Sequence, residues 1–195
     1  MCDNRGMVKA IVFDCFGVLV TEAWLPFKKK YFAGDAVLFE KASDAAKKAN
    51  LGLISHNDFI KEAAKLAGIT PDEAWAYISR NVPDEELFEY IQELKKDYKI
   101  GFLSNIAGDY LNRMFTPEQI EVFDTIELSY ESGFIKPEPR AYINIAKKMG
   151  VDVSETVMVD DQPRNIYGAE AAGMQAILYD NIDQFKKDIK PILAV

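Results

Sequence analysis

The sequence contains few of the residues that build disulfide frameworks or zinc sites. Its 195 residues include two cysteines, Cys2 and Cys15, and one histidine, His56. These counts exclude a disulfide framework, and they also exclude zinc sites with C-x-x-C or H-E-x-x-H spacing. Because proteins of the reducing cytoplasm keep their thiols free, we expect a cytoplasmic protein.

Long apolar stretches and an excess of positive charge are also missing. Residues 1–10 lack the apolar stretch of a signal peptide, and no segment approaches the ~18 apolar residues of a membrane helix. The net charge is -8, which disfavours general binding to nucleic acid or to anionic membranes, since phosphate groups need clustered Lys and Arg. We therefore expect neither nucleic acid nor a membrane as a partner.

The composition is that of a globular protein, with 49% hydrophobic and 28% charged residues. The length fits one domain of ordinary size, or one core domain with a small insertion. A chain of this length buries roughly 70% of its unfolded surface, so that a core forms without disulfides or structural metals.

Short apolar runs recur along the chain and predict a parallel sheet. Residues 10–13 are continuously apolar, which is typical of a strand buried on both faces. Four later segments resemble it, the second of them more weakly: 100–103, 125–129, 156–159 and 176–179. The helices predicted between strands include 85–96, 139–149 and 164–172, the last two each followed by glycine. This alternation predicts an α/β fold with a Rossmann-like parallel sheet and helices on both faces.

One long segment, residues 21–81, breaks the alternation because it contains helical patterns and no convincing strand. Thr70 to Glu73 reads as a capping box, Ser55 starts a similar helix, and Gly68 marks a helix end. We therefore predict a catalytic core of residues 1–20 and 82–195 with an inserted all-helical cap of residues 21–81. An insertion directly after the first strand lies at the carboxyl edge of the sheet, where α/β proteins bind ligands.

Polar side chains occur in four separate loops of this pattern. Asp14 directly follows the first strand, Ser104 and Asn105 follow the second, and Asp160 and Asp161 follow a later one. Lys136 precedes a further helix. Any one of these side chains alone would be read as a helix cap or a surface charge. The complete set, in this order, favours a shared site.

Electrostatics indicates what this site would need. Two carboxylates about 4 Å apart repel by ~4 kcal/mol at an effective dielectric constant of 20. Lys136 offsets part of the repulsion among three carboxylates, and a divalent cation would offset the rest. Oxygen ligands without a nearby His or Cys favour Mg²⁺ over zinc. A carboxylate beside Mg²⁺, with Ser and Lys to hold anionic oxygens, suits nucleophilic attack on phosphorus.

Taken together, these motifs resemble the haloacid dehalogenase-like hydrolase superfamily, and in particular its phosphatase-like branch with a small helical cap. The motifs are residues 14–19 (DCFGVL), 103–105 (LSN), Lys136-Pro137, and Val159-Asp160-Asp161 followed by Asn165. The resemblance covers the whole chain. It implies a magnesium-dependent hydrolase that acts on a small phosphorylated metabolite.

The resemblance also implies a role for each matching residue. Asp14 would be the nucleophile that forms an aspartyl intermediate. Ser104, with Asn105 beside it, would hydrogen-bond the transferring group, and Lys136 would stabilise charge on both nucleophile and substrate. The metal ligands would be carboxylates and one backbone carbonyl: Asp14, Asp161, the carbonyl of Phe16, and Asp160 in support. A small-molecule substrate is expected, and a homodimer is the assembly left open.

One residue, Phe16, departs from the phosphatase pattern. Phosphatases of this superfamily usually carry a second Asp two residues after the nucleophile, where it works as general acid and base. Phe16 cannot transfer a proton. The 2-haloacid dehalogenases have an aromatic residue there and need no metal, whereas Asp160-Asp161 resembles the metal-binding version. Metal-independent dehalogenation, and a catalytically silent protein that binds a ligand or partner, therefore remain as alternatives.

The start of the cap segment carries aromatic and basic residues. Trp24, Phe27 and Tyr31 follow helical spacing, which predicts core packing, with lining of a substrate cavity as the alternative. Lys28, with the two lysines that follow it, predicts a solvated helix face and not a phosphate-binding patch. Arg164, within the last motif, is expected at the surface near a helix start.

Overall fold

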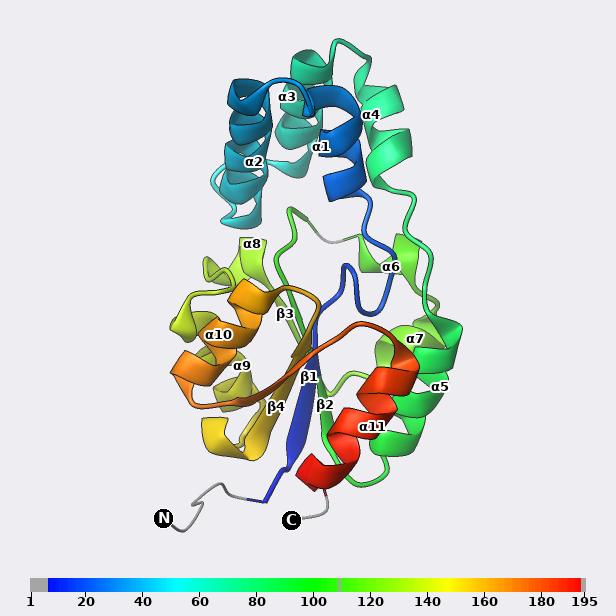
Figure 1. Cartoon of the computed structure of the whole chain (residues 1–195), viewed down its shortest axis with the longest axis vertical. Coiled ribbons are helices and arrows are strands. Elements are labelled where there is room, and N and C mark those ends of the chain that lie inside the picture. The colour runs from blue at the N-terminus through cyan, green and yellow to red at the C-terminus, as the bar shows by residue number, and fades with distance from the viewer. Residues whose placement is uncertain (1–6, 109, 194–195) are drawn as a thin grey trace.

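Five parallel strands form the centre of the larger part of the molecule (Figure 1). The computed structural model describes residues 7–108 and 110–193. The strand order is β3-β2-β1-β4-β5, and each neighbouring pair is parallel. The strands are β1 Ala10–Phe13, β2 Lys99–Ser104, β3 Thr125–Leu128, β4 Thr156–Asp160 and β5 Gln175–Leu178. The predicted α/β fold with a parallel sheet is confirmed.

Helices cover both faces of this sheet because the strands are apolar on both sides. In β1, Ile11 and Phe13 belong to a core cluster with α5 (Glu85–Leu94) and α11 (Ile182–Leu193). Ala10 and Val12 belong to a second cluster with α9 (Pro139–Met149) and α10 (Pro163–Ala172). Alternate side chains of a strand point to opposite faces, so one continuous apolar run serves two cores.

Several short elements were not predicted. They are α6 Leu111–Met114, α7 Pro117–Glu121, α8 Ser129–Ser132 and the 3₁₀ helix η1 Val153–Glu155. Each is too short for a helical period to show in the sequence. Helix α11 is longer and was also not predicted, although its buried residues Phe185 and Ile189 lie four positions apart, as on one face of a helix.

Residues 21–81, all of which are described, form four helices and no strand. These are α1 Trp24–Phe32, α2 Ala36–Asn50, α3 His56–Ala67 and α4 Pro71–Ile78. Their ends follow the predicted signals. Ser55 accepts a hydrogen bond from the N–H of Asp58, Thr70 and Glu73 form a capping box, and Gly68 ends α3 in the left-handed conformation. The helices pack around an apolar cluster separate from those of the sheet, and Figure 1 shows them together above the carboxyl edge of the strands.

Two chain segments connect these helices to the sheet, and they are hydrogen-bonded to each other. The N–H of Thr21 donates to the carbonyl of Val82 (3.0 Å), and the N–H of Val82 donates to Thr21 Oγ1 (2.9 Å). The side chain of Asn81 also donates to the Thr21 carbonyl (2.7 Å).

The described helices all lack the length and apolarity that a membrane crossing requires.

Candidate active site

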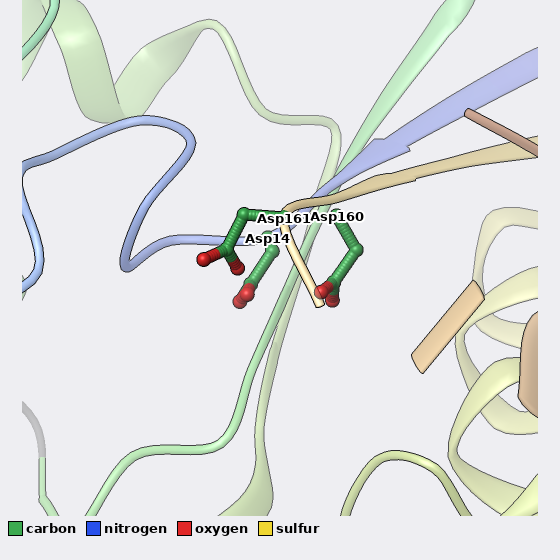
Figure 2. A group of neighbouring side chains, drawn as sticks. All are labelled: Asp14, Asp160 and Asp161. Atoms are coloured by element: carbon green, nitrogen blue, oxygen red, sulfur yellow. The ribbon is translucent and has the colours of Figure 1, made fainter. Parts of the chain in front are cut away.

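Three carboxylates lie together where β1 and β4 end. Asp14 follows the last residue of β1, Asp160 is the last residue of β4, and Asp161 comes next. One oxygen of each lies within 4.8 Å of the others, and Figure 2 shows the three side chains next to one another at the ends of the two strands. Because β1 and β4 are parallel neighbours in the sheet, their carboxyl ends meet at one edge.

Lys136 is the cation at the centre of this cluster. Its Nζ lies 2.6 Å from Asp14 Oδ1 and 2.6 Å from Asp160 Oδ2, and its side chain is almost fully buried. Burial lowers the pKa of Lys136, but the charges of Asp14 and Asp160 outweigh burial and leave this pKa raised. The ammonium group therefore stays charged. When all three carboxylates are ionised, they and the one ammonium group leave two negative charges at the site.

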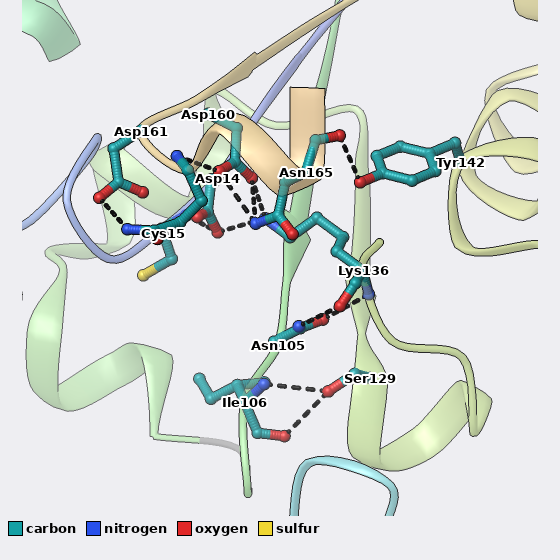
Figure 3. Close-up of polar contacts among 11 residues, drawn as sticks. Asp14, Cys15, Asn105, Ile106, Ser129, Lys136, Tyr142, Asp160, Asp161 and Asn165 are labelled. Carbon is teal, nitrogen blue, oxygen red and sulfur yellow. Dashed lines mark hydrogen bonds and ion pairs between the residues drawn. The ribbon is translucent and has the colours of Figure 1, made fainter. Parts of the chain in front are cut away.

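Asn105, which directly follows β2, fixes the backbone of Lys136. Its Nδ2 donates to the carbonyl of Lys136 (2.9 Å), and its Oδ1 accepts the N–H of Lys136 (2.8 Å). Figure 3 shows this double contact below the carboxylates. The peptide between Lys136 and Pro137 is cis. Asn105 thus positions the lysine, as well as lining the same cavity as Asp14.

Asp14 has one oxygen held and the other open. Oδ1 accepts the N–H of Cys15 (2.6 Å) and pairs with Lys136. Among the described residues no hydrogen bond reaches Oδ2. Burial raises the pKa of Asp14, the charge of Lys136 lowers it in part, and the net effect is a pKa raised to about 8. A carboxylate fixed on one oxygen and free on the other is oriented as a nucleophile requires.

Asp160 has both oxygens occupied, which gives it a supporting place. Oδ1 accepts the N–H of Gln162 (2.8 Å) and Asn165 Nδ2 (3.0 Å), and Oδ2 pairs with Lys136. The Asn165 carbonyl in turn accepts the hydroxyl of Tyr142 (2.7 Å). The sequence motif included Asn165, but we did not predict it as a site residue. No sequence signal points to Tyr142, because it reaches the Asn165 carbonyl only through the packing of α9 on α10.

Asp161 is the carboxylate that best fits a metal ligand. Its Oδ2 accepts the side-chain amide of Gln162 (2.7 Å), and its Oδ1 is buried without a hydrogen-bond partner among the described residues. A buried, unpartnered carboxylate oxygen is costly unless a cation meets it. With Asp14 Oδ2 open nearby and an all-oxygen donor set, these residues fit Mg²⁺.

A cavity of about 260 Å³ opens from the carboxylates to the helices of the cap segment. Most of the predicted site residues line it: Asp14, Phe16, Asn105, Lys136 and Asp161. Ser104 and Asp160 are the predicted site residues that do not line it. Ser104 is fully buried, and its hydroxyl has no hydrogen-bond partner in the described part of the chain.

The cavity wall formed by α1 differs from the expectation for its lysines. Lys28 is half-buried and lines the cavity, so the prediction of a solvated face is wrong for this residue. The two lysines after it are exposed as expected. Phe27 is buried in the cap cluster, as predicted, whereas Trp24 lines the cavity. Arg164 is exposed, as expected, and also lines the cavity. Helical spacing identified the inward face of α1 but not which side chains end at the cavity.

Comparisons with known proteins agree with this architecture. The chain is 28% identical to D-ribitol-5-phosphate phosphatase of Bacteroides thetaiotaomicron over 96% of this chain and 99% of that protein. A solved hydrolase of the haloacid dehalogenase-like family from Porphyromonas gingivalis has a TM-score of 0.75 and 24% identity, over 95% of this chain and 99% of that one. A Bacteroides thetaiotaomicron enzyme of this family, solved with magnesium and inorganic phosphate, has a TM-score of 0.73 and 22% identity, over 89% and 94%.

The family assignment itself rests on the sequence match. Residues 8–173, which include all of the clustered carboxylates and Lys136, match the family model described as haloacid dehalogenase-like hydrolase. The parallel sheet with its strand-end carboxylates is consistent with this sequence match. The chain is a member of the haloacid dehalogenase-like hydrolases.

Proposed function

We propose that this hydrolase is a Mg²⁺-dependent phosphatase that acts on a small phosphorylated metabolite through Asp14. The observation that carries the proposal is the Asp14 carboxylate, held on one oxygen by Lys136 and open on the other, beside the unpartnered oxygen of Asp161. The phosphatase activity named for the Bacteroides relative supports it. We also propose a cytoplasmic setting, on the grounds given by the low cysteine content.

Each residue has a distinct part in the proposed reaction. Oδ2 of Asp14 attacks phosphorus, the bond to the leaving oxygen breaks, and an aspartyl phosphate forms, which water then hydrolyses. Lys136 and the N–H of Cys15 keep the Asp14 side chain oriented. Asn105 positions Lys136. The role of Ser104 as a donor to the transferring group stays a prediction, because its buried hydroxyl lacks a partner among the described residues but does not line the cavity.

Asp14 and Asp161, with the Phe16 carbonyl and with Asp160 in support, would hold the magnesium ion. When bound, Mg²⁺ supplies charge stabilisation for the transferring phosphoryl group. We propose the division into a core of residues 1–20 and 82–195 and a cap of residues 21–81, with the cap helices closing the cavity over the substrate. The separate apolar cluster of these helices supports this division.

The test is release of phosphate from a panel of small phosphate esters, with and without Mg²⁺. We expect magnesium-dependent turnover in the wild-type protein. In Asp14→Asn, which keeps the shape of the side chain but removes its charge, turnover should fall to background. Asp97→Asn changes an exposed aspartate in a loop and serves as the matched control. Residual activity of Asp14→Asn within about tenfold of wild type would place the chemistry elsewhere, since loss of a nucleophile costs far more.

A second reaction, metal-independent dehalogenation of a 2-haloacid, is favoured by one observation: Phe16 lines the cavity beside Asp14. A halide leaving group needs no proton, so an aromatic residue at this position does not impair its departure. The same panel therefore includes a 2-haloacid with halide release as the readout. Halide release without metal, in the absence of phosphate release, would replace phosphatase by dehalogenase. If neither phosphate nor halide is released, the result would indicate a catalytically silent binding protein.

A further inference from the structure

Two cations from different helices line the cavity, and the proposed phosphoryl transfer uses neither. Lys28 belongs to α1 of the cap segment, and Arg164 belongs to α10 of the sheet layer below it (Figure 1). Both line the cavity that contains Asp14. We call Lys28 and Arg164 the cap–core cation pair.

Lys28 is partly removed from water, and no carboxylate of the described residues lies within ion-pair distance of it. Its Nζ donates to Ser43 Oγ (3.0 Å) and lies 4.4 Å from the ring centroid of Phe39. Burial lowers the pKa of Lys28, the negative charge of Glu22 raises it, and the positive charge of Arg164 lowers it by a smaller amount. Lys28 and Arg164 line the same cavity, so an anion bound there would be attracted by both charges.

Arg164 occupies a helix position that disfavours positive charge. It is the second residue of α10, whose first turn contains no acidic residue. The N-terminus of a helix carries a partial positive charge and attracts anions, so an arginine there adds to the positive potential instead of cancelling it. The described residues provide no carboxylate that pairs with Arg164. Lys28 and the start of α10 thus contribute positive potential from two different elements.

Glu22 is the carboxylate in the same cavity that attracts Lys28. Its two oxygens already accept the N–H groups of Trp24 (2.6 Å) and Leu25 (2.8 Å) at the start of α1. Burial raises the pKa of Glu22, and the negative charge of Asp161, which lines the same cavity, adds to this effect. Because the backbone engages Glu22, Lys28 and Arg164 remain without an ion-pair partner among the described residues.

We propose that Lys28 and Arg164 bind a second anionic group of the substrate, a carboxylate or a second phosphate, while the first phosphoryl group lies at Asp14. This inference rests on the proposed phosphatase function and specifies its substrate class as phosphate esters with a further anionic group. Because one cation comes from each layer, such an anion bridges cap and core and holds the cavity closed over Asp14.

The experiment compares matched pairs of ligands that differ in one anionic group. Glycerol 3-phosphate and 3-phosphoglycerate differ in a carboxylate, and fructose 6-phosphate and fructose 1,6-bisphosphate differ in a phosphate. Dissociation constants are measured by calorimetry on the Asp14→Asn protein, which prevents turnover, and kcat/KM is measured on the wild type. We expect about 10- to 100-fold tighter binding of the doubly anionic member in at least one pair, as charge-assisted hydrogen bonds provide. The preferred pair identifies the second group.

Lys28→Met and Arg164→Gln, each combined with Asp14→Asn, should reduce this preference ratio toward one. Lys29→Met, on an exposed neighbour in the same helix, is the matched control and should keep the ratio. Equal binding within both pairs, or a ratio unchanged in both variants, would overturn the inference. A wild type that releases no phosphate from any ester, while the ratio and its loss are observed, would overturn the proposed function alone.

Discussion

Phe16 lies two residues after Asp14, half-buried at the cavity wall. The Phe16 side chain cannot protonate the leaving group, because a phenyl ring has no acidic proton. The leaving oxygen must then depart unprotonated or take its proton from water. The penalty grows with the basicity of the leaving group.

We expect the wild type to cleave acetyl phosphate and p-nitrophenyl phosphate far better than sugar phosphates, whose leaving alcohols have a pKa of roughly 15 and need a proton most. Phe16→Asp should narrow the gap. The measurement is kcat/KM across phosphate esters that differ in leaving-group pKa, for both proteins. The fold of the variant is checked first, because loss of a buried Phe can cost ~3–5 kcal/mol. If kcat/KM depends equally weakly on the leaving-group pKa in both proteins, another group supplies the proton.

Gly17 makes room for the Asp161 carboxylate, the proposed metal ligand. Its φ is +87°, and a Cβ at this position would meet the Asp161 carboxylate, with Cγ at 2.6 Å. Gly17→Ala should therefore destabilise the fold by about 1–2 kcal/mol through its left-handed backbone. It should also displace Asp161 and weaken the stabilisation by magnesium. Thermal melting with and without Mg²⁺ measures both effects.

Gly34→Ala is the matched control, because a Cβ there meets nothing within 4 Å and its φ is not positive. It should melt within a degree or two of wild type, as surface substitutions stay within about 0.5 kcal/mol. A Gly17→Ala protein with a wild-type magnesium response would remove the link between Gly17 and Asp161.

At the scale of elements, the position of α10 against the segment that carries Lys136 decides the geometry of the site. Gly168, in the middle of α10, is buried against Pro137, and a Cβ there would meet the Pro137 carbonyl and lie 2.8 Å from its Cβ. The same helix carries Asn165, which holds Asp160, and Asp160 holds Lys136. A displacement of α10 would therefore also move Lys136, through Asn165 and Asp160.

Gly168→Ala should lower the free energy of unfolding by about 1–3 kcal/mol, because it overpacks this contact. Activity should fall as well, since Lys136 and Asp160 move relative to Asp14. Denaturant unfolding and phosphate release check the two parts. Glu170→Ala, at an exposed position of the same helix, is the control and should change stability by less than about 0.5 kcal/mol. A Gly168→Ala protein with wild-type stability and activity would contradict the close packing.

At the scale of the whole molecule, the excess negative charge of the site links metal binding to stability. Three buried or half-buried carboxylates face one ammonium group, so a bound divalent cation removes repulsion that only the folded state contains. A ligand that binds only the folded state raises its stability.

We expect Mg²⁺ at about 100 times its dissociation constant to stabilise the protein by about 2.7 kcal/mol, or to raise its Tm by about 5–10 °C. Asp161→Asn should lose most of this response, whereas Asp97→Asn should keep it. Differential scanning calorimetry gives the values. A wild-type melt that millimolar Mg²⁺ leaves unchanged would refute the metal assignment and favour dehalogenation or a silent protein.

Local patterns in the sequence determined the elements and the chemistry they carry. Continuous apolar runs predicted the strands, and the residues directly after them included Asp14 and Asp161, because a strand end is read from adjacent residues. Helix ends at Ser55, Gly68 and Thr70 were also predictable, since capping depends on side chains within a few positions.

Only the tertiary structure decided which of these side chains act together. Lys136 bridges Asp14 and Asp160, and Tyr142 supports Asn165, through contacts between elements that are distant along the chain. The same packing buries Ser104 away from the cavity and brings Lys28 into it. A residue pattern sets which face of an element is apolar, but the place of a polar side chain depends on what the neighbouring elements leave open, and that is settled only when they pack.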